Sequence, residues 1–207
     1  MDPGFAAGSL ERALRRVCGP QTQIVAVSFG DCTSMGQCRD RVLAATQPLR
    51  SDHPDCAFDV VANSMGGLVA RYAALTPDDI SRCGLPAPTQ QGALRIHHLY
   101  TICTPHLGAR MAEGVFGSPL THDMRPGSHF LACLDGAYGE RGYGLTCFAR
   151  EGDSIVGADR SAPAGVKPVT LDTPPFELAH VDAHRDPRIV LAVVRGLRGE
   201  PSLPLGE

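Results

Sequence analysis

The clearest chemical signal in this sequence is Ser64, which stands where an apolar run gives way to a helical pattern. Residues 60–72 read VVANSMGGLVARY, so a predicted strand turns directly into a predicted helix at the serine. Such a turn holds the hydroxyl clear of the backbone and aims the N–H of Met65 toward a developing oxyanion. Gly66 is expected to let strand and helix approach closely. An ordinary serine N-cap is the alternative interpretation, but the whole strand-turn-helix context favours a nucleophile.

Two segments of the sequence resemble the lipase and esterase branch of the α/β-hydrolase family. Residues 62–66 match its Gly-x-Ser-x-Gly motif, with Ala62 in place of the first glycine. Residues 101–109, TICTPHLGA, resemble the Thr-Pro-His-x-Gly segment of lipase-like members. The resemblance extends in element order from about Gly4 to Leu197. It implies a serine hydrolase that acts on carboxylic esters, lipid-like or simple, through an acyl-enzyme on Ser64, with no cofactor and no metal.

A serine nucleophile needs a base, and the base needs an orienting carboxylate. In the family the chain order is serine, acid, histidine. Asp153 follows a late apolar run and a turn, which resembles the family's acid loop, and Asp159 is the alternative. His180 stands at the expected distance before the Asp-Pro start of the last helix, and His184 is the alternative. The resemblance therefore predicts a Ser64, Asp153 and His180 triad.

The second oxyanion donor of the family comes from a loop near the N-terminus that follows a strand. Residues 2–5, DPGF, occupy the corresponding position, which makes the N–H of Phe5 a candidate donor beside that of Met65. Only two residues precede Pro3, too few for a strand. We therefore expect that the fold lacks its N-terminal strands in this chain, and that the natural start lies upstream, with a targeting segment as one option. Direct pairing of the neighbouring strands is the other option.

The elements that position these residues alternate between strands and helices. Apolar runs predict strands at 23–28, 56–62, 96–103, 145–149 and 169–171. One-sided apolar patterns predict helices at 9–17, from 35 to about Pro48, from the serine turn to Leu75, and at 186–197. This alternation predicts a mainly parallel sheet with helices on both faces. We expect a single domain over residues 1–198 and a Pro-rich tail over 199–207.

A long irregular excursion over about residues 110–144 interrupts this pattern. Excursions of this length are usually functional or mobile, so its apolar side chains could form a lid that binds an acyl chain. Local core packing is an equally good interpretation. The side chains concerned are Met111, Val115, Phe116, Leu120, Met124, Phe130 and Leu131.

Composition limits the partners. The formal net charge is −3 and the basic residues do not cluster, so nucleic-acid binding is not expected. Eight cysteines without metal-type spacing favour reduced thiols in a cytoplasmic setting, although Cys32 and Cys38 could form a disulfide. His106 is expected to pack near the serine turn. The expected partner is a small-molecule or lipid ester, and transient contact with a membrane or lipid surface stays open.

Three alternatives to the esterase remain from sequence. A thioesterase or an amidase would use the same triad, and substrate profiling separates these from an esterase. A truncated, non-catalytic α/β-hydrolase relative would keep the fold without turnover, and a fluorophosphonate label, which reacts only with an activated serine, separates this alternative from an active enzyme.

Overall fold

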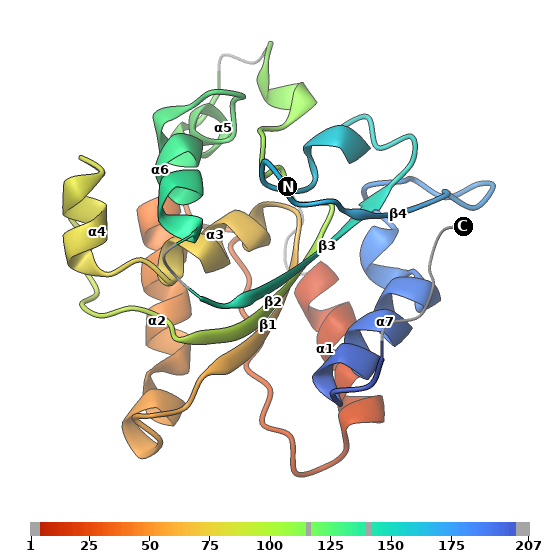
Figure 1. Ribbon diagram of the computed structural model, residues 1–207, viewed down its shortest axis with the longest axis horizontal. Helices are drawn as coiled ribbons and strands as arrows, with labels where there is room; N and C mark the ends of the chain where they lie inside the picture. Colours follow the sequence, from red (N-terminus) through yellow and green to blue (C-terminus); the bar gives the residue numbers. More distant parts are fainter. Residues whose placement is uncertain (1–4, 115–116, 140–141, 202–207) are drawn as a thin grey trace.

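A computed structural model describes residues 5–114, 117–139 and 142–201. Its centre is a parallel sheet with the order β1-β2-β3-β4. The strands are β1 (Phe58–Asn63), β2 (Ile96–Ile102), β3 (Gly144–Arg150) and β4 (Val169–Leu171). All three pairings are parallel, so the carboxyl ends of the strands meet at one edge. The predicted α/β fold with a mainly parallel sheet is confirmed (Figure 1).

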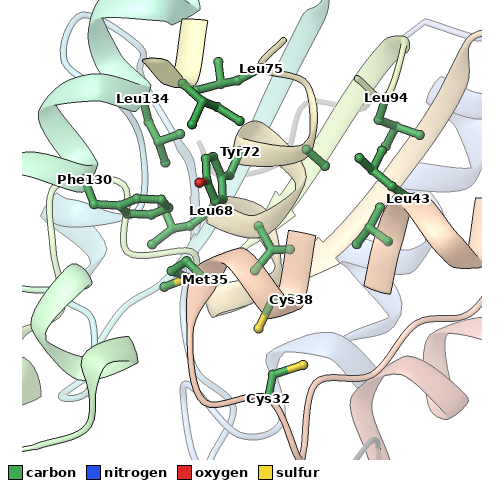
Figure 2. Close-up of a cluster of buried hydrophobic side chains, with 14 of the residues drawn as sticks. Cys32, Met35, Cys38, Leu43, Leu68, Tyr72, Leu75, Leu94, Phe130 and Leu134 are labelled. Atoms are coloured by element: carbon green, nitrogen blue, oxygen red, sulfur yellow. The ribbon is translucent and has the colours of Figure 1, made fainter. Parts of the chain in front are cut away.

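Helices on one face of the sheet enclose the larger core. They are α2 (Met35–Asp52), α3 (Met65–Ala73), α4 (Pro77–Arg82), α5 (Pro119–Asp123) and α6 (His129–Tyr138). Figure 2 shows side chains from α2, α3 and α6 meeting in this core, among them Leu43, Leu68 and Phe130. The ring of Tyr72 meets that of Phe130 edge-on, with centroids 5.2 Å apart. Burial of this kind supplies most of the stability that holds α3, and with it the serine turn.

The opposite face is covered by α1 (Phe5–Cys18) and α7 (Pro187–Leu197), which lie side by side in Figure 1. Leu10 and Leu14 of α1 pack with Ile189 and Val193 of α7 against β2 and β3. Asp186 caps α7, since its side chain accepts the N–H of Arg188 at 2.9 Å. Three short 3-10 turns, η1 (Arg110–Ala112), η2 (Ala158–Arg160) and η3 (Ala183–Arg185), complete the described elements.

The predicted first strand is wrong. Residues 23–28 carry three β-branched apolar residues, yet they adopt no regular structure. A strand exists only through hydrogen bonds to a neighbour, and within the described residues this segment has no backbone hydrogen bond to β1. The predicted end of α2 near Pro48 is also wrong, because the helix continues through this proline to Asp52.

The excursion over residues 110–144 contains ordered elements rather than one irregular loop. Leu120, Phe130 and Leu131 are almost fully buried in the larger core, which favours core packing for these three side chains. Met111 is exposed, and Met124 is partly buried against two core clusters. Val115 and Phe116 lie outside the described residues, as does the end of the predicted tail, residues 202–207.

Two further observations concern compartment. All eight cysteines, including Cys32 and Cys38, are free thiols. Among the helices of the described residues, none is both long and apolar enough to cross a bilayer.

Candidate active site

Ser64 connects β1 to α3 in a strained backbone conformation. Its φ of 51° and ψ of −131° are rare for a residue with a side chain, and such conformations cost about 1–3 kcal/mol and cluster at functional sites. The Ser64 N–H donates to the carbonyl of Ile102 at 2.8 Å, which fastens the turn to β2. The side chain makes no N-cap hydrogen bond to α3. Its hydroxyl is therefore not used as a helix cap.

The imidazole of His180 faces the Ser64 hydroxyl. The distance between His180 Nε2 and Ser64 Oγ is 2.9 Å, across 116 residues of sequence. His180 Nδ1 lies 2.8 Å from Asp153 Oδ2. A carboxylate only accepts hydrogen bonds, so Nδ1 carries the proton and Nε2 is free to accept the hydroxyl proton of Ser64. The carboxylate of Asp153 therefore fixes the tautomer of His180.

Asp153 is buried behind His180 and is held from both sides. Its Oδ1 accepts the backbone N–H groups of Ile155 and Val156, each at 2.9 Å. Burial raises the pKa of Asp153, but the hydrogen bond and charge of His180 and the two N–H donors outweigh it, so the pKa lies below its ordinary value. Asp153 is therefore ionised at neutral pH and fixed in orientation.

The segment after β2 supports the serine turn, a role that the sequence did not reveal for Thr104. The hydroxyl of Thr104, which is fully buried, donates to the Ser64 carbonyl at 2.8 Å. A Cβ atom on Gly67 would lie 2.3 Å from Thr104 Oγ1, whereas one on Gly66 would meet nothing closer than 3.7 Å. The predicted close approach at Gly66 is wrong, because the tight packing occurs one residue later.

His106, in the same segment after β2, is buried near the serine turn, as expected, and is hydrogen-bonded at both ring nitrogens. Arg71 Nη1 of α3 donates to His106 Nδ1 at 3.0 Å, so Nε2 carries the proton and donates to Thr101 Oγ1 at 3.1 Å. Burial and then the charge of Arg71 hold the pKa of His106 well below its ordinary value. Asp135 neutralises Arg71 at 2.8 Å. A neutral His106 thus ties α3 to β2.

Cys103, a fully buried residue that directly follows β2, lies next to Asp153 and His180. Ligand atoms of Cys103, Asp153 and His180 lie within 4.8 Å of one another. Burial, followed by the charge of Asp153, raises the pKa of the thiol to about 12. The thiol therefore stays protonated, and metals bind thiolates rather than thiols. A lone cysteine at the end of an apolar run gives no sequence signal for such a position.

The alternative residues lie elsewhere. Asp159 is exposed and pairs with Arg110 at 2.6 Å. His184 is buried in η3. Met65 is the first residue of α3, where backbone N–H groups have no partner within the helix. Phe5 is the first residue of α1, and the oxyanion roles of both N–H groups stay predictions.

Ser64 and His180 open into a cavity of about 1240 Å³. The cavity follows β1 along its free side, and α1, α2 and residues 22–30 contribute its other walls. Leu10, Val27 and Val60 are among the apolar side chains that line it. A large, mostly apolar cavity with a small number of polar groups is typical of a site for an apolar small molecule.

The fold is similar to that of a solved bacterial enzyme. A structure of phospholipase PlaB from Legionella pneumophila in complex with thio-NAD matches 96% of this chain with a TM-score of 0.57 and 11% sequence identity. A second structure of PlaB matches 72% of this chain and 36% of its own, with a TM-score of 0.47 and 13% identity. This chain spans about half, 53%, of PlaB in the first match. No curated protein matches this chain in sequence.

The family assignment comes from sequence. Residues 15–137 match the family described as "Putative serine esterase (DUF676)", and this range includes Ser64, Thr104 and His106. Asp153 and His180 lie outside the matched range, so their proximity to Ser64 is an independent observation. With more than half of its residues in the match, and with an α/β-hydrolase fold, this chain belongs to the DUF676 serine esterase family.

Proposed function

We propose that this protein hydrolyses carboxylic esters through an acyl-enzyme on Ser64. The observation that carries the proposal is the continuous contact from Ser64 Oγ to His180 Nε2 at 2.9 Å and from His180 Nδ1 to Asp153 Oδ2 at 2.8 Å. These three residue types in this order of contact form the arrangement that activates a serine. The strained turn at Ser64 supports the same role, and so does the Ser64 hydroxyl, which makes no N-cap hydrogen bond to α3.

The chemistry follows from these contacts. His180 Nε2 removes the hydroxyl proton as Ser64 Oγ attacks the ester carbonyl, and Asp153 stabilises the imidazolium that forms. The tetrahedral oxyanion develops near the start of α3, where the N–H of Met65 donates to it and the helix dipole favours negative charge. The N–H of Phe5 is the candidate for a second donor. His180 then protonates the leaving alcohol, and water releases the acyl group by the reverse sequence.

We further propose a lipid-like ester as the substrate. The cavity beside Ser64 is mostly apolar, and PlaB, whose fold is similar, is a phospholipase. A thioester or amide substrate would use the same three residues. Parallel assays with p-nitrophenyl butyrate, a butyryl thioester and a butyryl anilide distinguish these classes, and we expect the ester to be cleaved fastest.

The decisive experiment is covalent labelling followed by turnover. A fluorophosphonate probe should label the wild-type protein at Ser64 and leave Ser64→Ala unlabelled, because only an activated serine attacks phosphorus. Ser64→Ala should also lose hydrolysis of p-nitrophenyl butyrate by about 10⁴-fold or more. Full activity of a folded Ser64→Ala protein contradicts the assignment, and an unlabelled wild-type protein indicates a non-catalytic relative.

A further inference from the structure

Exposed apolar side chains gather around the candidate active site. Within the described residues, eight large apolar side chains are exposed, and three of them lie between residues 176 and 181: Phe176, Leu178 and Val181. Phe176 has no protein contact that shields it, with an exposed fraction of 108%. His180 belongs to the same short loop. A single exposed apolar residue needs no explanation, but three in six residues beside a triad histidine do.

Two further exposed apolar residues, Leu107 and Met111, lie beside the segment that follows Asp153. Met111 N–H donates to the carbonyl of Ile155 at 3.1 Å, and Leu107 N–H donates to that of Arg160 at 3.2 Å. Met111 is 58% exposed. Met111 and Val181 also line the cavity that contains Ser64. Five of the eight exposed apolar side chains therefore come from the loops that carry or border Asp153 and His180.

The loop after β4, which projects from the body of the molecule (Figure 1), is held in a fixed shape. The fully buried Arg150 donates to Glu177 Oε2 at 2.6 Å. Asp182 closes the loop twice, since its carboxylate accepts the N–H of Leu178 at 2.8 Å and its N–H donates to the Leu178 carbonyl at 2.9 Å. Phe176 has a φ of 68°, which is strained for an aromatic residue. The fold thus retains backbone strain while holding an aromatic ring in water.

We propose that residues 176–181, which we call the apolar loop, dock this protein on the surface of zwitterionic lipid. Inserting Phe176 and Leu178 among lipid chains removes apolar area from water, and a loop already fixed in shape loses little entropy on binding. Docking there brings the mouth of the Ser64 cavity to the lipid. Only the role of docking in ester hydrolysis rests on the proposed function; the binding to lipid does not.

Charge decides which lipid surface fits. Three carboxylates around the apolar loop are paired with arginines: Glu177 with Arg150, Asp172 with Arg188, and Asp182 with Arg185. Clusters of free lysines or arginines attract anionic membranes. The chain contains a single lysine, Lys167, and the arginines beside the loop are those already engaged in these ion pairs. Binding should therefore depend on apolar insertion, and should neither need anionic lipid nor weaken in high salt.

The test measures flotation with phosphatidylcholine vesicles, in Ser64→Ala protein so that no lipid is consumed. We expect binding that persists at high salt, and a fall in partitioning on the order of tenfold in Phe176→Asn/Leu178→Ser. Asparagine tolerates positive φ, so this variant should fold. Leu191→Ser, which removes an exposed leucine from α7, is the matched control and should bind normally.

Absence of binding to phosphatidylcholine, binding that requires anionic lipid, or equal binding of the double variant each overturns the proposal. Activity is measured separately in the catalytically intact protein with soluble p-nitrophenyl butyrate, which Phe176→Asn/Leu178→Ser should hydrolyse like wild type. If vesicles bind but the soluble ester is not cleaved, the proposed function fails while docking stands. If the soluble ester is cleaved but vesicles do not bind, docking fails alone.

Discussion

The carboxyl end and the free edge of β1 differ in how the backbone polar groups are hydrogen-bonded. At its carboxyl end, Ser64 is held by Ile102, Thr104 and His180, which come from two other parts of the chain. Along its free edge, β1 borders the large cavity, and no described strand pairs with it there. The carboxyl end is thus defined by converging contacts, whereas no described strand makes comparable contacts along the free edge.

The segment opposite that edge shows why an apolar, β-branched sequence is not sufficient for a strand. Residues 23–28 line the cavity across from β1. Two of their carbonyls accept hydrogen bonds from arginines: Arg15 Nη2 donates to Ile24 at 3.3 Å and Arg41 Nη1 to Ser28 at 3.1 Å. Side chains thus satisfy these two carbonyls, and no backbone ladder joins the segment to β1 within the described residues. The difference between the two sides can be tested by five predictions, from the largest effect to the smallest.

The largest effect is expected at the base. His180→Ala should reduce kcat for p-nitrophenyl butyrate by about 10⁴-fold or more, because His180 Nε2 is the group at 2.9 Å from Ser64 Oγ that can take the proton, and the described residues show no second such partner. His184→Gln should keep most of the activity of wild type if the protein folds. Stopped assays on both purified variants, with circular dichroism as the folding control, decide between them. The reverse result would assign the base to His184.

A comparable effect is expected at the acid. Asp153→Asn keeps the shape of the side chain but supplies no charge and favours the wrong imidazole tautomer, so kcat should fall by about 10⁴-fold. Asp159→Asn alters only an exposed pair with Arg110 and should change kcat by less than about twofold. Steady-state kinetics measure both. Equal losses in the two variants would mean that the acid is wrongly identified.

Ser64, Asp153 and His180, whose catalytic roles stay predictions, could be singled out from the sequence because each belongs to a local pattern with a chemical requirement: a tight strand-to-helix turn, an acid after a strand, and a histidine before the last helix. Their contacts with one another, by contrast, depend on the parallel register, which the sequence indicates only in outline. Thr104 was missed as a site neighbour because its importance comes from β2 lying beside β1. Cys103 was missed because its place beside Asp153 comes from β2 lying beside β3. Helix α6 was missed since glycines and prolines around it suggested an irregular excursion.

The packing of the turn gives the next prediction. Gly67→Ala would bring a methyl group to 2.3 Å from Thr104 Oγ1, and overpacking of this kind costs about 1–3 kcal/mol of unfolding free energy. Gly66→Ala meets only ordinary contacts, nearest at 3.7 Å, and should change stability by less than about 1 kcal/mol. Urea unfolding of both variants measures the difference. If Gly66→Ala is the more damaging, the tight contact lies at Gly66 after all.

The buried His106 predicts a pH effect. Because its pKa in the fold is far below the ordinary value of 6.5, the unfolded chain binds the extra proton first as pH falls. Stability is therefore complete above pH about 6.5 and declines below it, by up to about 1.4 kcal/mol per pH unit for this one group. His106→Gln should be less stable at neutral pH but should lose this part of the slope. Urea unfolding between pH 5 and 7.5 tests this, and equal slopes in both proteins contradict it.

The smallest and most local prediction concerns the free edge itself. Phe58 donates its N–H to the carbonyl of Arg95, just before β2, and Ser64 donates its N–H to the carbonyl of Ile102 in β2. Because successive residues of a strand alternate sides, Val60 and Ala62 also face β2, whereas Asp59, Val61 and Asn63 turn their N–H groups to the cavity. Amides at the second set should exchange with solvent at least about tenfold faster than those at the first. Residue-resolved hydrogen exchange measures this within one strand, which removes differences in global stability. Equal protection of both sets would mean that the edge of β1 is paired in solution, and the contrast between its two sides would disappear.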